Sequence, residues 1–151
     1  MSVTTALRAT VVILAVGASY FLLASRDSDA ACNDAHERVF ATSGGFEPLA
    51  GLEPAIDDLR RDCDGATGLL AAAETIRQAS DRRPELAPLA VDLARESTEI
   101  EPDNYIAWAT LAVALGPTDA DAARDALARA RELNPRLRTP APLAPHLEPQ
   151  R

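Results

Sequence analysis

Residues 105–135, YIAWATLAVALGPTDADAARDALARARELNP, decide the fold predicted for this chain. Two runs of helix-forming residues flank a break at Gly116–Pro117, and Pro135 follows the end of the second run. Asp103 is suited to cap the first helix, and Thr118 or Asp119 the second. The second run carries a buried stripe at helical spacing, formed by Ala123, Ala126, Leu127, Ala130 and Leu133. The stretch therefore predicts two antiparallel helices joined by a short turn.

The composition extends this prediction to the whole chain. Hydrophobic residues make up 47% of the 151 residues, but aromatic residues only 4%, and alanine fills about a fifth. Alanine is the best helix former and allows close approach of backbones, so an all-α fold is expected. Residues 27–151 carry thirteen arginines against twenty-three acidic residues, a balance of −10. Such a surface repels phosphate backbones, which argues against a nucleic-acid partner.

The N-terminal segment is predicted to reach a membrane. Residues 9–25 form an uncharged run of seventeen, which as a helix would span about 25 Å, the short end for a bilayer. Arg8 precedes this run, so the positive-inside rule places residues 1–8 in the cytoplasm and the rest outside it. The alternative is a cleaved signal peptide, because Ser28 and Ala30 are small residues at peptidase spacing. Both interpretations export the same domain.

The chain has two cysteines, Cys32 and Cys63. Residues 32–42 and a helix with Pro54 in its first turn would form an antiparallel hairpin over 30–63, which returns both sulfurs to one end. We therefore predict a structural disulfide. A zinc site with His36 as third ligand is the alternative, but no fourth ligand is obvious, so no metal is predicted.

Two more helices are expected between this hairpin and residue 103. Residues 69–79 read as a helix capped by Asp64 or Thr67, and residues 83–98 as a helix that begins between Pro84 and Pro88. The inward positions at helical spacing are Leu69, Ala72, Ala73 and Ile76 in the first, and Leu86, Leu89, Leu93 and Ala94 in the second.

The last two helices resemble a tetratricopeptide repeat (TPR). The matching positions are Trp108, Leu111, Ala112, Leu115, Ala123, Leu127, Ala130 and Pro135. The turn is one residue shorter than the family pattern, and Ala112 stands where glycine is commonest. A weaker copy lies 33 residues upstream, at Ala90, Ala94, Ser97 and Pro102. The expected order is a capping hairpin (30–63), a degenerate repeat (64–102) and a repeat (103–135), stacked as a short TPR-like α-solenoid with Trp108 as a buried packing residue.

The resemblance also implies a function. Members of the family bind peptides or helices of other proteins on the concave face, which here would offer Tyr105, Ile106, Ala109 and Val113, with Arg77 from the helix before. We therefore expect a membrane-tethered adaptor of the bacterial cell envelope. The alternative is a structural accessory subunit of a membrane complex, such as envelope polysaccharide or cytochrome c maturation machinery.

No catalytic constellation accompanies these features. His36 and His146 have no motif around them, and Asp57 and Asp58 are expected on a solvated helix face. We predict a non-enzyme without cofactor or small-molecule substrate. Residues 136–151 are rich in proline and read as a solvated, extended tail, or as a segment whose leucines at 137, 143 and 147 fold over the last helix.

Overall fold

The computed structural model describes residues 29–147, and every regular element among them is helical. The predicted all-α class is confirmed for these residues, which contain no strand. Residues 29–44 are helical, and the elements that follow are η1 (Leu49–Gly51), α2 (Leu52–Asp62), α3 (Thr67–Ser80), η2 (Pro84–Leu86), α4 (Ala87–Ile100), α5 (Tyr105–Leu115), α6 (Ala120–Leu133) and α7 (Ala144–Leu147).

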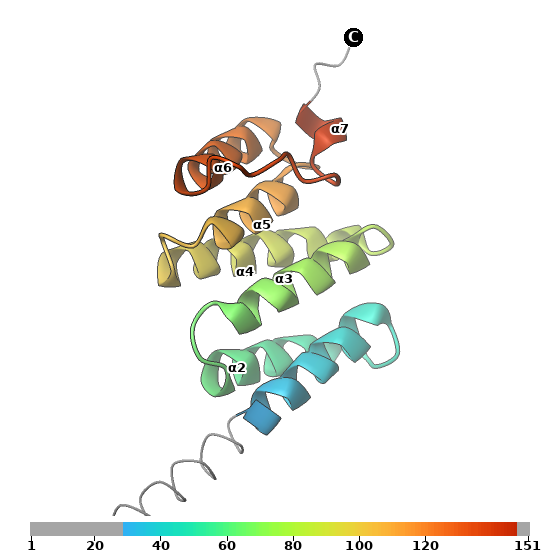
Figure 1. Cartoon of the computed structure of the whole chain (residues 1–151). Coiled ribbons are helices and arrows are strands. Elements are labelled where there is room, and N and C mark those ends of the chain that lie inside the picture. Colours follow the sequence, from blue (N-terminus) through green and yellow to red (C-terminus); the bar gives the residue numbers. More distant parts are fainter. Residues whose placement is uncertain (1–28, 148–151) are drawn as a thin grey trace, which may run out of the picture.

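The long helices form three pairs stacked in a row (Figure 1). Helix 29–44 pairs with α2, α3 with α4, and α5 with α6, while α4 also packs on α5 and α3 on both α2 and α5. Alanines at the contacts allow this close packing, because a methyl side chain keeps neighbouring backbones near one another. The predicted inward positions of α3 are all buried, and Leu86, Leu93 and Ala94 follow the prediction while Leu89 is half-buried.

The helix starts agree with the sequence at some positions and differ at others. Pro88 lies in the first turn of α4 as expected, and the Asp119 side chain caps α6 by accepting a bond from the Ala122 N–H at 3.0 Å. The predicted cap at Asp103 is wrong, since the Asn104 side chain accepts the Ile106 N–H at 2.9 Å instead. Asn104 holds this position because it directly precedes the first helical residue.

The cap of α3 comes from a distant part of the chain. No side chain of Asp64 or Thr67 caps α3, which corrects the prediction. The Glu101 carboxylate instead accepts the Ala66 N–H at 3.0 Å and the Asn104 side-chain amide at 2.7 Å. The hydrogen bond from Ala66, followed by that from Asn104, lowers the pKa of Glu101. One carboxylate therefore ties the start of α3 to the start of α5.

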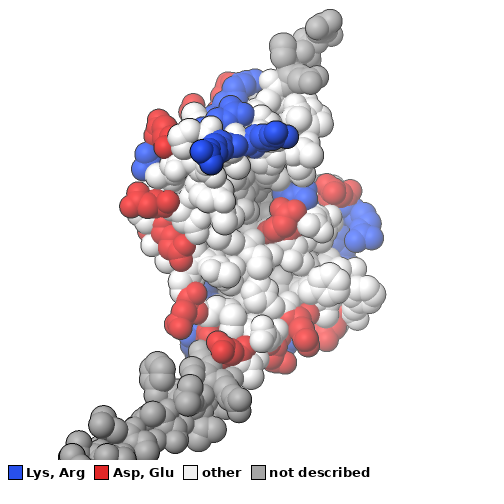
Figure 2. Space-filling view, in the orientation of Figure 1, with Lys and Arg blue, Asp and Glu red and all other residues white. Residues whose placement is uncertain are grey.

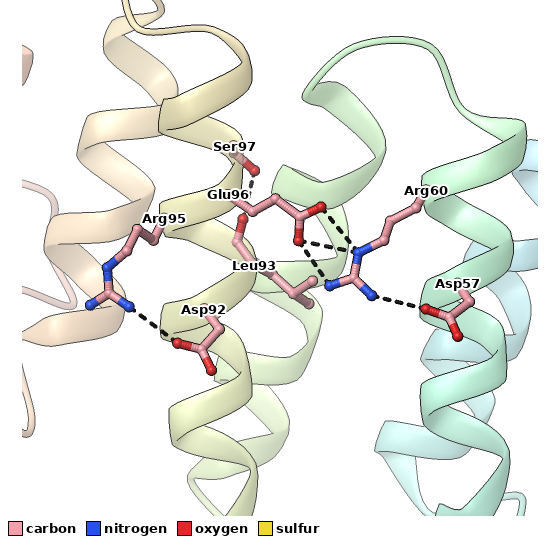
Figure 3. Close-up of polar contacts among 7 residues, drawn as sticks. All are labelled: Asp57, Arg60, Asp92, Leu93, Arg95, Glu96 and Ser97. Atoms are coloured by element: carbon pink, nitrogen blue, oxygen red, sulfur yellow. Dashed lines mark hydrogen bonds and ion pairs between the residues drawn. The ribbon is translucent and has the colours of Figure 1, made fainter.

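A second polar contact joins the first pair of helices to the next (Figure 3). The Arg60 guanidinium on α2 donates to Glu96 on α4 from Nε at 3.0 Å and Nη2 at 2.8 Å, and from Nη1 to Asp57 at 3.0 Å. The buried Ser97 hydroxyl donates to the Leu93 carbonyl at 2.8 Å, so its polar atom is satisfied inside the stack. The forked contact between Arg60 and Glu96 links α2 to α4 at the surface of the stack.

The Trp108 ring is half-buried, whereas the sequence predicted a buried packing residue. It packs against the core, and its indole N–H donates to the Pro102 carbonyl at 2.8 Å. An indole needs a partner for its N–H, and the carbonyl lies in the α4–α5 connection at the edge of the stack. The Trp108 ring therefore packs on the core with one side and holds the α4–α5 connection with its N–H group. Leu111, Ala112, Leu115, Ala123, Leu127 and Ala130 are buried as predicted, and Leu133 is half-buried.

The C-terminal segment packs on the last pair, so the expectation of a solvated extended tail is wrong for residues 137–147. Leu143 is completely buried, and Leu137 and Leu147 pack partly against the core. The Leu143 side chain packs directly against Gly116. A Cβ at position 116 would come within 2.8 Å of the Leu143 Cδ1 atom, so a side chain would not fit there. The alternative interpretation, in which these leucines fold over the final helices, holds because they cover apolar surface that would otherwise face water.

Within residues 29–147, no helix is long and apolar enough to span a bilayer. The predicted anchor at 9–25, the predicted cytoplasmic residues 1–8 and Ser28 lie outside the described part of the chain.

Candidate functional site

The binding face predicted on α5 is partly used for packing. Ile106 is 49% exposed, Tyr105 and Ala109 are half-buried, and Val113 is buried. Arg77, on α3, is half-buried and donates to Glu74 from Nε and Nη2, each at 2.9 Å. Burial opposes ionisation of Glu74, but the hydrogen bonds from Arg77 and Gln78 outweigh it and lower the pKa of Glu74. Of the predicted set, Ile106 keeps the most accessible apolar side chain.

Two phenylalanines near the first turn are more exposed than any residue of that set. Phe40 is 60% exposed and Phe46 is 77% exposed, and their rings stack with centroids 6.2 Å apart. Phe40 projects from helix 29–44, and Phe46 follows the turn, where its backbone N–H donates to the Ala41 carbonyl at 2.9 Å. The two rings together form an exposed apolar patch.

Hollows on both sides of Phe40 continue this surface toward α3. One of about 530 Å³ lies beside His36, Phe40 and Thr75, and another of about 230 Å³ lies beside Phe40, Phe46 and Thr75. We call this region the Phe40–Phe46 surface; its residues are His36, Glu37, Phe40, Ala41, Ser43, Gly44, Phe46, Thr75, Gln78, Ala79 and Arg82. Figure 2 shows that uncharged atoms cover much of the face formed by helix 29–44, α3 and α5, with most charged groups around it and some acidic and basic atoms within it.

Opposite charges lie on the two hollows of the Phe40–Phe46 surface. Glu37 lines the larger hollow, and Arg82 lines the smaller one. Within residues 29–147, neither side chain makes an ion pair or a side-chain hydrogen bond, so both are available to a ligand. The Phe40–Phe46 surface is therefore apolar in the middle, with an acidic residue on one side and a basic residue on the other.

The cysteines lie at the other end of the first helix pair, Cys32 on helix 29–44 and Cys63 directly after α2. The predicted disulfide between Cys32 and Cys63 is confirmed, with the two Cα atoms 4.9 Å apart. A ring nitrogen of His36 and both sulfurs lie within 4.8 Å of one another, and burial lowers the pKa of His36. A hollow of about 300 Å³ beside this cluster is lined by Asp29, Cys32, Asn33, His36, Asp62, Cys63, Asp64, Thr67 and Gly68.

Sequence reasoning missed Phe40 and Phe46 because it treated residues 30–63 as a cap. A signal was present: Phe40 comes one turn after His36 and lies off the stripe made by Ala35 and Val39. Two of the three phenylalanines of the chain fall within this short segment. An aromatic residue on the polar side of an amphipathic helix is expected to be exposed to solvent.

Comparison of the chain with protein-family models, with curated proteins and with solved structures finds no match for any part of it.

Proposed function

We propose that this chain is a membrane-tethered, extracytoplasmic TPR-like adaptor that binds a segment of another protein and performs no catalysis. The N-terminal apolar run supports the tether, and the repeat spacing at residues 90–135 supports the TPR-like interpretation. The observation that carries the binding role is the exposed, stacked pair of Phe40 and Phe46 beside two hollows.

The two rings can supply binding energy with little loss of side-chain conformational entropy. Covering a phenylalanine side chain contributes on the order of 2 kcal/mol, and most of each ring is still in water. Because the rings already stack on each other, little side-chain freedom is lost when a partner covers them. Aromatic anchors next to pockets are the usual centres of protein interfaces.

The shape and charge of the Phe40–Phe46 surface support a partner segment with a particular pattern of side chains. It carries two apolar side chains, one for each hollow, which fits an amphipathic helix or an extended peptide. A basic residue on the segment would meet Glu37, and an acidic residue or a terminal carboxylate would meet Arg82. This pattern sets the direction in which the segment lies between helix 29–44 and α3.

Site-specific crosslinking in native membranes tests the proposal. A photo-reactive amino acid replaces Phe46 in the full-length chain, and the same replacement at Ile106 reports on the α5 face predicted from the sequence. We expect a discrete adduct with one protein from position 46 and little from position 106. Adding Phe40→Ala should reduce the adduct about tenfold or more, the effect of losing an anchor of 1.4 kcal/mol.

The melting temperature separates a lost contact from a lost fold. Phe40→Ala should leave it nearly unchanged, since the ring is mostly exposed. An adduct from position 106 but not from 46 would move the site to α5, and adducts from neither would contradict the adaptor role. A stoichiometric adduct that excess competing peptide cannot reduce would favour a fixed subunit of a complex.

A further inference from the structure

Three side chains of types that can bind a metal ion meet at the end of the first helix pair that lies opposite its connecting turn. Cys32 and His36 lie one turn apart on helix 29–44, and Cys63 directly follows α2. The two sulfurs and a ring nitrogen of His36 lie within 4.8 Å of one another. While the disulfide is present, its sulfurs have no negative charge and are poor ligands.

We propose that reduction of the Cys32–Cys63 disulfide converts this cluster into a Zn²⁺ site with the ligands Cys32, His36 and Cys63. An external dithiol supplies two electrons and two protons, is itself oxidised to a disulfide, and leaves Cys32 and Cys63 as thiols. Zn²⁺ then displaces both thiol protons into solvent and binds the two thiolate sulfurs and the imidazole nitrogen. A water completes four-coordination on the side of the hollow.

The geometry of the site does not depend on the disulfide alone. Ala35 and Val39 on helix 29–44 and Ile56 and Leu59 on α2 are buried in the same core. Between one and two turns from the cysteines, toward the turn that connects the two helices, Arg38 and Asp58 form an ion pair at 2.6 Å. These contacts keep the backbones together after the covalent bond is broken.

The sulfurs need to move only a short way. Two Zn–S bonds of about 2.3 Å at a tetrahedral angle place the sulfurs about 3.8 Å apart, a separation that rotation of the side chains can reach. Helix α3 closes one side of the cluster, because a Cβ on Gly68 would come within 2.7 Å of the Cys63 Cβ. The cation therefore enters from the hollow.

The surroundings select the class of metal. Two thiolates and an imidazole favour Zn²⁺ over Mg²⁺ or Ca²⁺, which prefer oxygen ligands. Asp29 and Asp64 line the hollow, so its field attracts a divalent cation. Neither carboxylate oxygen belongs to the three-ligand cluster, which leaves the fourth position for water.

Metal binding to the full-length chain in detergent tests the proposal. The protein is reduced with a phosphine, kept without oxygen, and titrated with Zn²⁺ alone against a chromophoric chelator. We expect one Zn²⁺ per reduced chain and none with comparable affinity in the oxidised chain. His36→Ala should weaken binding about tenfold to a hundredfold, while His146→Ala, a histidine in α7, should change nothing. Co²⁺ in place of Zn²⁺ should show thiolate charge-transfer absorption that is lost in Cys32→Ala.

Three results would overturn the proposal. Equal binding by the oxidised chain would assign the metal to carboxylates. Unchanged affinity in His36→Ala would remove the imidazole from the site. Loss of the helical circular dichroism signal on reduction, with or without Zn²⁺, would show that the helix pair does not persist without the disulfide. None of these results bears on the Phe40–Phe46 surface, whose crosslinking is measured on the oxidised chain.

Discussion

The first and last helix pairs are stabilised in opposite ways. Helix 29–44 and α2 are joined by a disulfide and by the ion pair between Arg38 and Asp58, and two phenylalanines at their connection face water. The pair α5 and α6 has no covalent link and closes by packing, with Leu143 from the C-terminal segment covering one side. A covalent bond at one end allows apolar surface at the other end to stay exposed.

The difference follows from helix 29–44 and α5, the first helix of each pair. Helix α5 contains no charged residue and is apolar around its circumference, so it is stable only when α3, α4 and α6 surround it. Helix 29–44 has one buried stripe, with Ala35 and Val39, and neighbours on fewer sides. Its free side is where Phe40 lies. The first pair therefore leaves two large rings mostly in water, whereas Ile106 is the one exposed residue of α5.

Removal of the disulfide should have the largest effect. Cys32→Ala with Cys63→Ala opens a loop with a sequence separation of 31 and should lower the free energy of unfolding by about 3–4 kcal/mol. Urea unfolding measures this loss, and a thiol reductant should have no further effect on the variant. Hydrogen exchange should rise in helix 29–44 and α2 and stay low in α5 and α6. Equal loss of protection at both ends would contradict the contrast between the pairs.

Shortening of the covering leucine should have the next largest effect. Leu143→Ala removes a completely buried side chain and should cost about 2–3 kcal/mol, the lower part of the usual range because the residues around Leu143 are mostly exposed and can relax. Thermal unfolding measures it, and Leu49→Ala, at a leucine that is 41% exposed, is the matched control. Faster proteolysis within residues 137–147 should accompany the loss. A Leu143→Ala variant as stable as the control would return the segment to a solvated tail.

A smaller, pH-dependent effect on stability is expected from Glu101, which links the start of α3 to the start of α5. The pKa of Glu101 lies below its ordinary value of 4.5 in the folded chain, so its contribution to stability is present above that value and is lost as the pH falls through the lowered pKa. Glu101→Gln should therefore lower the melting temperature at pH 7, and the gap to the parent should close as the pH falls below 4.5 and through the lowered pKa of Glu101. Glu99→Gln, at an exposed position near the end of α4, is the control. A gap independent of pH would mean that the charge of Glu101 does not cap α3.

Short-range patterns predicted much of this architecture. The helical class, the inward positions of α3, the start of α4 near Pro88 and the disulfide could all be read from spacing and residue type. These features depend on neighbours three or four residues apart, or on two helices joined by one turn. Helix periodicity contains that information directly.

The failures share a different cause. The cap of α3 by Glu101 and the burial of Leu143 depend on residues that meet only after the pairs have stacked. Periodicity within one helix does not say which other segment will arrive beside it. The same limit applies to Trp108, whose position at the edge of the stack depends on the path of the α4–α5 connection.

The sequence by itself determined that the chain forms alanine-rich helices, that the last two are separated at Gly116–Pro117, and that two cysteines return to one end of the first pair. The tertiary structure alone decided which apolar side chains stay in water. Within residues 29–147, no segment covers Phe40 and Phe46, whereas α3, α4 and α6 all pack on α5. Exposure is a property of the whole packed chain, since a side chain is buried only when something else reaches it.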